Sequence, residues 1–445
     1  MSVRITWLRE EERLAHELRQ LREEGLDPAS LAEAWAAAEG LEPGGRRREA
    51  QRLLDEAASL ARSRGGPAAE EELVRATLAA VPWGGRTFPR KELERRIRAG
   101  WLGRAAGCLL GKPVEKVPRE GIRAILESAG RWPLDNWFSA EGVPPDVLER
   151  YPWNRASRPT SLRENISCMP EDDDLNYSML NLHVAETAGL DFTTDDVAAA
   201  WLSMLPALTV FTAERVAYQN LLDYLDAPET AWHRNPYREW IGAQIRADVW
   251  GWLSPGDPAA AAALAWRDAR LSHTGNGAWG ELYAAALVAA AFTHPTPGAV
   301  VRAALAVVPR DSRLAAAVRL VLDLHDSEPD FERAVDRLYA ELGHYHWVHA
   351  INNAALLTAA LLYGEGDYSR SITLAVAGGW DTDCNGATAG AVVGTMLGAV
   401  PERWTAPLRD TVRTSLKGFD NSSLSGLAAR TARLVPERYR AGGEA

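Results

Sequence analysis

The sequence predicts an all-α protein. Apolar residues recur at helical spacing along most of the chain, and Ala, Leu, Glu and Arg dominate. The alternating runs of Val, Ile and Thr that are typical of half-buried strands are nearly absent. With 445 residues, the chain is long enough for more than one domain. Its hydrophobic content of 47% and charged content of 24% are ordinary for a globular protein in water.

Charge and segment composition exclude several classes of protein. The net charge of −11 argues against a nucleic-acid-binding surface, because neutralising phosphates requires an excess of Lys and Arg. The first residues do not resemble a signal peptide, and the longest apolar stretches are too short or too rich in Gly to span a bilayer comfortably. The three cysteines are widely separated and imply no disulfide framework. We therefore expect a cytoplasmic protein that binds neither nucleic acid nor membrane, and the oligomeric state stays open.

Composition divides the chain into two parts. Residues 1–88 are polar, rich in Arg and Glu, and broken by Pro and Gly near residues 43 and 66, so they are predicted to form an N-terminal helical extension. Residues 89–445 are richer in Ala, Gly and Trp and carry every candidate site, so they are predicted to form a compact multi-helix domain. Within this part, the irregular stretch from Trp132 to Met169 is rich in Pro and Trp. Such long loops are often functional.

Glycines recur at a spacing of three or four residues in two predicted helices. Glycine in a helix interior costs about 1 kcal/mol relative to alanine, so each series needs a structural reason. The simplest reason is close approach of another backbone, and the two helices are candidates to pack on each other. The two series are Gly100, Gly103, Gly107 and Gly111, and Gly386, Gly390, Gly394 and Gly398.

Four consecutive acidic residues, Glu171 to Asp174, precede a helical pattern. Acidic residues at a helix start interact favourably with the helix macrodipole, so this position alone does not require a site. The macrodipole accommodates one or two acids, however, whereas four adjacent carboxylates repel one another. A Mg²⁺ ion would relieve the repulsion, because it prefers carboxylate oxygen ligands. The cluster is a candidate metal site.

A second acidic cluster, Asp381-Thr382-Asp383, follows a helix that is predicted to end at Gly378-Gly379. Either aspartate could cap the next helix. Three adjacent oxygen-bearing side chains nevertheless exceed what one cap needs. Together the two clusters would suit a shared site for one or two metal ions, although their spacing does not prove that they meet.

Four segments, taken in order, resemble the motifs of ADP-ribosylglycohydrolases, a family that includes the dinitrogenase-reductase-activating glycohydrolases. Residues 103–115, Gly-Arg-Ala-Ala-Gly-Cys-Leu-Leu-Gly-Lys-Pro-Val-Glu, resemble the opening helix and loop of the family. Glu171 to Asp174 resemble its Thr-Asp-Asp-Thr motif, and Ser272-His273 before an Ala-rich helix resemble its Ser-His segment. Residues 379–390, Gly-Trp-Asp-Thr-Asp-Cys-Asn-Gly-Ala-Thr-Ala-Gly, resemble its Gly-Gly-Asp-Thr-Asp-Thr motif. The joint match is far more specific than any one segment.

The resemblance implies a domain that binds two Mg²⁺ (or Mn²⁺) ions and hydrolyses a ribosyl N- or O-glycosidic bond. The implied substrate is a nucleotide-sugar or an ADP-ribosylated protein side chain. Glu115 would lie near the substrate ribose, and Glu115 or Asp173 could act as the general base. The implied metal ligands are Glu171, Asp172, Asp173, Asp381, Asp383 and Cys384. The candidate substrate-binding residues are Asp174, Ser272, His273, Gly275, Asn276, Gly277, Trp380 and Asn385.

Several of these positions depart from the family pattern. Glu171 and Asp174 stand where threonine is usual in the family. Cys384 replaces a threonine that ligates metal, Trp380 replaces a glycine, and Cys108 replaces an aspartate. A cysteine thiolate is a poor ligand for Mg²⁺, so the backbone carbonyl of Cys384 could serve instead. The extra carboxylates would tighten divalent binding but repel a pyrophosphate. Two alternatives therefore stay open: the same machinery acting on a nucleoside-like small-molecule glycoside, and a non-catalytic relative that binds ADP-ribose or has a structural role.

The segment from Ser272 to Gly277 has two interpretations. Its backbone N–H groups could bind a phosphate of the substrate. An ordinary Gly-rich turn explains the same residues about as well.

Overall fold

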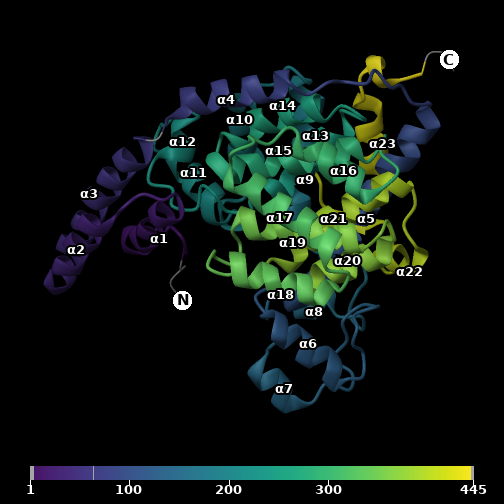
Figure 1. The fold of residues 1–445 in the computed structure, drawn as a ribbon, viewed down its shortest axis with the longest axis horizontal. Helices are drawn as coiled ribbons and strands as arrows, with labels where there is room; N and C mark the ends of the chain where they lie inside the picture. Colours follow the sequence, from purple (N-terminus) through teal and green to yellow (C-terminus); the bar gives the residue numbers. More distant parts are fainter. Residues whose placement is uncertain (1–4, 64, 442–445) are drawn as a thin grey trace.

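The computed structural model of the chain describes residues 5–63 and 65–441 (Figure 1). Residues 1–4 and 442–445, the outer ends of the two predicted parts, lie outside the described residues. Helices make up nearly all of the regular structure. The described residues contain one sheet, in which β1 (Thr411–Val412) pairs antiparallel with β2 (Ser422–Ser423). The predicted all-α class is confirmed.

The N-terminal part is helical, as its composition predicts, and α1 to α3 project from the main body as an arm (Figure 1). Leu14 of α1 and Leu53 of α3 are buried in a hydrophobic cluster that belongs to the arm alone. Val74 of α4 instead joins the large core of the main body. The domain boundary at residue 88 remains a prediction. Helix α4 ties the two parts together, and so does α1, whose buried Glu17 pairs with Arg238 of the main body at 2.8 Å. The elements are α1 (Glu10–Glu23), α2 (Ala29–Ala37), the 3-10 helix η1 (Ala38–Gly40), α3 (Pro43–Arg62) and α4 (Pro67–Ala79).

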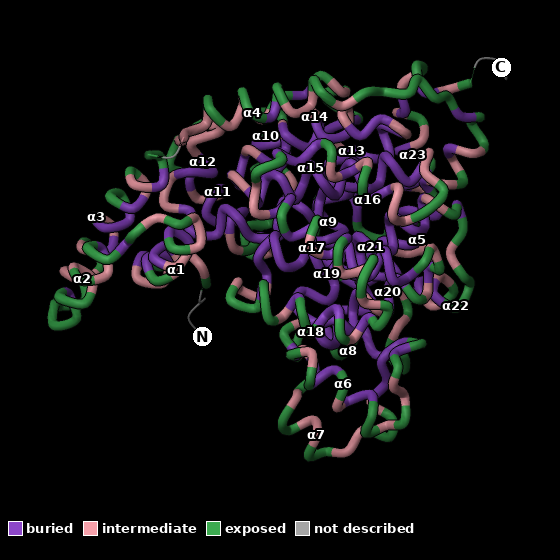
Figure 2. Tube along the Cα trace, in the orientation of Figure 1, coloured by how far each residue is buried: buried purple, intermediate pink, exposed green. Residues whose placement is uncertain are grey.

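The main body begins at α5, and its central helices are almost completely buried (Figure 2). Among the described residues, we find no helix with the length and apolar character needed to cross a membrane. The helices are α5 (Arg90–Gly111), α6 (Arg119–Ser128), α7 (Pro145–Arg150), α8 (Arg158–Ser161), α9 (Asp173–Ala188), α10 (Thr194–Met204), α11 (Thr212–Leu222), α12 (Glu229–Trp232), α13 (Asp248–Trp252), α14 (Pro258–Ala269), α15 (Gly275–Ala290), α16 (Pro297–Leu305), α17 (Arg313–Ser327), α18 (Phe331–Leu342), α19 (Ala350–Tyr363), α20 (Tyr368–Ala377), α21 (Thr382–Leu397), α22 (Glu402–Thr405) and α23 (Leu424–Leu434). The 3-10 helices are η2 (Lys112–Val114), η3 (Ala207–Thr209), η4 (Gln244–Arg246), η5 (Ala406–Leu408) and η6 (Glu437–Tyr439).

The Pro- and Trp-rich stretch contains only the short helices α7 and α8. Together with α6, α7 forms a lobe that protrudes from the main body, and much of its surface is exposed (Figures 1 and 2). The stretch returns to the body at Met169, which is fully buried. It therefore leads directly from the exposed lobe into the first acidic cluster.

Helices α5 and α21 pack with their backbones in direct contact. Gly103 faces the carbonyl group of Gly390, and Gly107 faces that of Gly386. A Cβ atom at Gly103 or Gly107 would lie 2.2 or 1.9 Å from the opposing carbonyl oxygen, far closer than van der Waals contact allows. The prediction that the two glycine series pack on each other is confirmed. Gly398 plays a different part, because it ends α21 in the left-handed conformation, with φ 66°.

Candidate active site

Three helix ends meet in the main body: the end of α5, the start of α9 and the start of α21. Thr382 Oγ1 donates a hydrogen bond of 2.9 Å to the Gly111 carbonyl oxygen, which fixes the start of α21 against the end of α5. The next residue, Lys112, forms an ion pair with Asp172 and donates to the Glu171 carbonyl oxygen at 3.0 Å. The two acidic clusters therefore lie together in space, although they are far apart in the sequence.

Two groups of possible metal ligands occur at this junction. The first comprises Cys108, Asp172 and Asp174, and the second comprises Asp174, Asp383 and Cys384. Within each group the candidate ligand atoms lie within 4.8 Å of one another. Asp174 belongs to both groups, and no described residue donates a hydrogen bond to its buried Oδ2. The donor atoms thus form one continuous buried site with an unfilled acceptor at its centre.

The carboxylates of this site outnumber the positive charges around them. Burial raises the pKa of Asp383 to about 7, and the neighbouring Glu115 and Asp172 add to this effect. Burial and Asp383 raise the pKa of Asp381 well above its ordinary value, and burial and Asp172 do the same for Asp174. Each raised pKa means that the ionised form is penalised by desolvation and by like charge. A divalent cation would supply the missing charge with the ligand chemistry that it prefers.

Two buried basic residues offset part of the negative charge. Arg104 contacts Asp174 Oδ1 at 3.0 Å and Asp248 Oδ2 at 2.7 Å. Burial alone would raise the pKa of Asp172, but the Lys112 ammonium and the Asp174 N–H group hold it below its usual value. Both Arg104 and Lys112 were missed by reasoning from the sequence. The signal was present, because each is a charged residue within or directly after the glycine series that predicts close packing.

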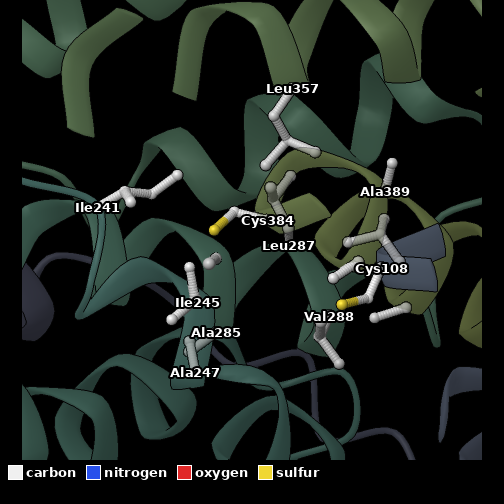
Figure 3. Packing of buried hydrophobic residues seen from close by; sticks show 14 of the residues in the cluster. Cys108, Ile241, Ile245, Ala247, Ala285, Leu287, Val288, Leu357, Cys384 and Ala389 are labelled. Carbon is white, nitrogen blue, oxygen red and sulfur yellow. The ribbon is translucent and has the colours of Figure 1, made fainter. Parts of the chain in front are cut away.

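The two cysteines of the site are buried among apolar side chains of the core (Figure 3). Burial raises the pKa of the Cys384 thiol well above its ordinary value, and Asp174 and Asp381 add to the effect. Cys108 is affected in the same direction. Both are therefore held as neutral thiols, which are weak partners for a hard cation. Ligation by the Cys384 side chain remains a prediction.

Glu115 lies at the edge of the acidic group and is partly exposed. Its Oε2 accepts a hydrogen bond of 2.6 Å from Asn154 Nδ2, and its Oε1 lies 3.0 Å from Lys116 Nζ. The Glu115 charge contributes to the raised pKa of Asp381 and Asp383, so it lies beside the second cluster. Two partners thus orient a carboxylate that can accept a proton from a molecule entering the site.

A cleft of about 750 Å³ opens next to Asn154. The residues on either side of Asn154, Trp153 and Arg155, both line it, as does Arg158. The residues that line it include two arginines and no acidic residue, in contrast to the acidic site that Asn154 contacts through Glu115. Its remaining lining residues are Leu148, Pro152, Pro159 and Asn165.

The side chains of the first acidic cluster point in different directions. Glu171 is exposed, and its carboxylate accepts hydrogen bonds from Asn176 Nδ2 at 2.9 Å and Ser415 Oγ at 2.6 Å. It is absent from both ligand groups. Asp173 is half-buried, and burial, Asp172 and Asp383 raise its pKa well above the ordinary value. The predicted roles of Glu171 and Asp173 stay predictions, while the geometry brings Asp174 to the centre of the site.

Residues around the second cluster fix its position. The Trp380 ring stacks on Tyr339, with centroids 4.3 Å apart and an interplanar angle of 16°. Asn353 Oδ1 accepts hydrogen bonds from the Asp381 N–H group at 3.1 Å and from Asn385 Nδ2 at 2.8 Å. Trp380 and Asn385, both predicted to bind substrate, are thus already engaged within the protein. Asn353 holds both ends of the turn that carries Asp381.

Ser272 and His273 belong to a buried network that centres on Arg246. Ser272 Oγ lies 2.8 Å from His273 Nδ1 and accepts a hydrogen bond of 3.1 Å from Arg246 Nη2. Burial lowers the pKa of His273 well below its ordinary value, and the Arg246 charge acts in the same direction. His273 is therefore neutral at physiological pH. Neither residue belongs to the two ligand groups.

The glycine-rich turn after His273 contacts carboxylates. The Gly275 N–H group donates to Glu70 Oε1 at 2.8 Å, and the Asn276 N–H group donates to Glu239 Oε1 at 3.0 Å. Gly277 packs on the backbone of residues 238 and 239. Two backbone donors that a phosphate would need are already satisfied, and the carboxylates would repel it. Because Glu70 lies on α4, this turn is part of the junction with the N-terminal part.

The Glu70 contact makes the junction sensitive to pH. Burial raises the pKa of Glu70 from 4.5 to about 7, with smaller contributions from Glu239 and Glu24. The folded state therefore binds the proton more tightly than the unfolded state, and stability is lost as the pH rises from about 5 to 7. At pH 8, we expect Glu70→Gln to raise the melting temperature and to increase the unfolding free energy by less than about 3 kcal/mol. At pH 5, we expect both quantities to stay unchanged.

Thermal unfolding at the two pH values measures this effect. Glu72→Gln is the matched control, because Glu72 lies on the same helix, is exposed and pairs with Arg75. A Glu70→Gln protein that melts below wild type at pH 8 would show that the ionised carboxylate stabilises the junction.

Two comparisons with known proteins give a match. The sequence model of the ADP-ribosylglycohydrolase family matches residues 89–441. A solved structure described as an ADP-ribosylglycohydrolase-related protein complex is similar, with 21% identity and a TM-score of 0.49, over 78% of this chain and 100% of that chain. A comparison with curated proteins gives no match. The family match includes Glu115 and both acidic clusters.

Proposed function

Because the chain belongs to the ADP-ribosylglycohydrolase family, we propose that it is a Mg²⁺-dependent glycohydrolase that cleaves the ribosyl N- or O-glycosidic bond of ADP-ribose conjugates. One observation carries this proposal: both acidic clusters and Glu115 meet at one largely buried site. Family membership supports glycohydrolase activity in general. The metal and the substrate are inferred from the chemistry of the side chains at that site.

The donors present fit a hard divalent cation. Asp174 and Asp383 would hold it through carboxylate oxygens, with Asp172 and Asp381 close by. The unpartnered Oδ2 of Asp174 and the raised pKa values are the observations that favour such an ion. When bound, Mg²⁺ or Mn²⁺ supplies a Lewis acid that polarises ribose hydroxyls or water. No described histidine belongs to either ligand group, which favours Mg²⁺ or Mn²⁺ over zinc.

The protein's own residues would handle the protons. Water adds to the anomeric carbon, the bond to the leaving nitrogen or oxygen breaks, and the leaving group gains a proton. Glu115, held by Asn154 and Lys116, would take the proton from the attacking water. Asp173 has a raised pKa, which suits the donation of a proton to the leaving group. The surrounding carboxylates would stabilise an oxocarbenium-like transition state.

The basic cleft beside Asn154 favours a substrate with phosphates. Arg155 and Arg158 would receive the pyrophosphate of ADP-ribose, because guanidinium groups bind phosphate oxygens in pairs. Trp153 would supply an apolar face for the nucleoside. The acidic site itself would repel phosphate. The substrate would therefore bind with its ribose at the acidic residues and its phosphates at the arginines. A nucleoside-like glycoside without phosphates would not use the arginines.

Hydrolysis assays with the purified protein and Mg²⁺ test the proposal. ADP-ribosylated peptides with N- and O-glycosidic links should release free ADP-ribose, while unphosphorylated nucleosides should not react. We expect Glu115→Gln to lower kcat by about 100-fold or more, since general base catalysis contributes about 10² to 10⁴. Glu120→Gln, an exposed acid on α6, is the control and should keep wild-type turnover. Equal turnover in the two variants would remove Glu115 from the mechanism.

A further inference from the structure

A lysine side chain enters the acidic site from within the protein. Lys112 is buried, with a side chain that is 8% exposed. Its Nζ forms an ion pair with Asp172 Oδ2 and donates to the Glu171 carbonyl oxygen at 3.0 Å. The chain has four lysines, and Lys112 is the one whose ammonium group contacts the first acidic cluster. This ammonium group lies where the sequence alone predicts only metal ions.

The ammonium group and the open ligands occupy different halves of the site. Asp172 uses Oδ2 for Lys112 and Oδ1 for the Asp174 N–H group at 2.9 Å. Both of its oxygens therefore already have partners. On the other half, Asp174 Oδ2 is buried without a described partner, and Asp383 lies within the same ligand group. Within the two ligand groups, the unpartnered carboxylate oxygen of Asp174 lies in the half that it forms with Asp383 and Cys384, away from the pair of Lys112 and Asp172.

We infer that the Lys112 ammonium permanently replaces one of the two divalent cations, so that the site binds a single divalent cation beside Asp174 and Asp383. The inference rests on the proposed function in assuming that the site binds a divalent cation. A second divalent ion at Asp172 would lie next to the ammonium group in a buried setting, where like charges repel strongly. It would also have to compete with an ion pair that is already formed.

The local backbone keeps Lys112 in place. Lys112, Pro113 and Val114 form the turn η2, and all three residues are buried. Gly111, directly before them, packs on the backbone of Thr382 and Asp383. A displaced Lys112 side chain would have to leave through this packed turn. The ammonium group is therefore a fixed part of the site.

Metal stoichiometry tests the inference without reference to activity. We expect calorimetric titration of the wild-type protein with Mn²⁺ to give one site per chain, and Lys112→Met to give two. Methionine keeps the length and apolar stem of lysine and removes the charge. Electron paramagnetic resonance of the fully loaded Lys112→Met protein should then show spin coupling between two neighbouring Mn²⁺ ions, absent from wild type.

Lys116→Met is the matched control. It removes the same charge four positions later, from an ammonium group that contacts Glu115 and not Asp172. We expect tighter Mn²⁺ binding in this variant with the stoichiometry unchanged at one. A gain of a second site in Lys116→Met would show that net charge alone governs occupancy, and would overturn the specific role of Lys112.

A second measurement on the wild-type protein covers the case in which Lys112→Met does not fold. Acetylation of exposed amines followed by mass spectrometry should label Lys91, Lys116 and Lys417 and spare Lys112, with and without saturating Mn²⁺. Two Mn²⁺ sites in wild type, or labelling of Lys112 upon Mn²⁺ addition, would overturn the inference while leaving the proposed function intact. If wild-type protein with one bound Mn²⁺ showed no hydrolysis, the proposed function would be overturned and the inference about Lys112 would stand.

Discussion

Replacing Gly107 by alanine is expected to destabilise the protein by about 3 kcal/mol or more. A Cβ atom at this position would collide with the Gly386 carbonyl group, which is backbone and cannot turn aside. Overpacking in a core typically costs about 1–3 kcal/mol. Here the added methyl group must separate two whole helices, so the cost lies at or above that range. Chemical denaturation monitored by circular dichroism measures it.

Gly84→Ala is the control for this substitution. Gly84 lies in the irregular segment between α4 and α5, and nothing lies within 4 Å of the position of its added Cβ. We expect its unfolding free energy to stay within about 0.5 kcal/mol of wild type. If Gly107→Ala were equally stable, α5 and α21 would not be in backbone contact in solution.

The second large effect is expected at Asp383. Asp383→Ala removes a carboxylate from the ligand group that it shares with Asp174, so divalent affinity and hydrolysis should fall together. We expect each to fall more than about 100-fold, because loss of a group that merely orients a metal ligand costs about 10- to 100-fold. Titration with Mn²⁺ and release of ADP-ribose measure the two effects.

Stability in the presence of a chelator separates this effect from misfolding. The Asp383 carboxylate is buried close to Asp381, Asp172 and Glu115, so its removal relieves repulsion in the metal-free protein. The chelated variant should melt no lower than chelated wild type. Asp311→Ala, at an exposed position before α17, should behave as wild type throughout. Wild-type affinity and turnover in Asp383→Ala would exclude the second cluster from the site.

The features of the fold that could be predicted are those that restrict which residue types occur at particular positions. Helical spacing of apolar residues predicts the helices, because each must bury one face. The glycine series predicts the α5–α21 contact, because close backbone approach excludes other residues at Gly103 and Gly107. The arm of α1 to α3, in contrast, has ordinary helical patterns that do not indicate where it docks. Its position depends on tertiary contacts between residues far apart in the chain.

The composition of the candidate site was predictable, but the direction of each side chain was not. The sequence marks four adjacent acids without distinguishing them, whereas the structure turns Glu171 toward Ser415 and Asp174 toward Arg104. Both partners are far in sequence from the acidic residues that they contact, so no local sequence pattern predicts these contacts. The same limit applies to the turn at Gly275, whose N–H group is satisfied by Glu70 from the N-terminal part.

The contact between α5 and α21 also governs which ions the site could discriminate. Arg104 of α5 holds Asp174, and Asp383 lies on α21, which touches α5 through main-chain atoms at Gly107 and Gly386. The distance between these two carboxylates is therefore set through α5. Mg²⁺ requires oxygens at about 2.0–2.1 Å and Ca²⁺ at about 2.3–2.6 Å. A frame held in this way would select by ionic radius and favour the smaller ion.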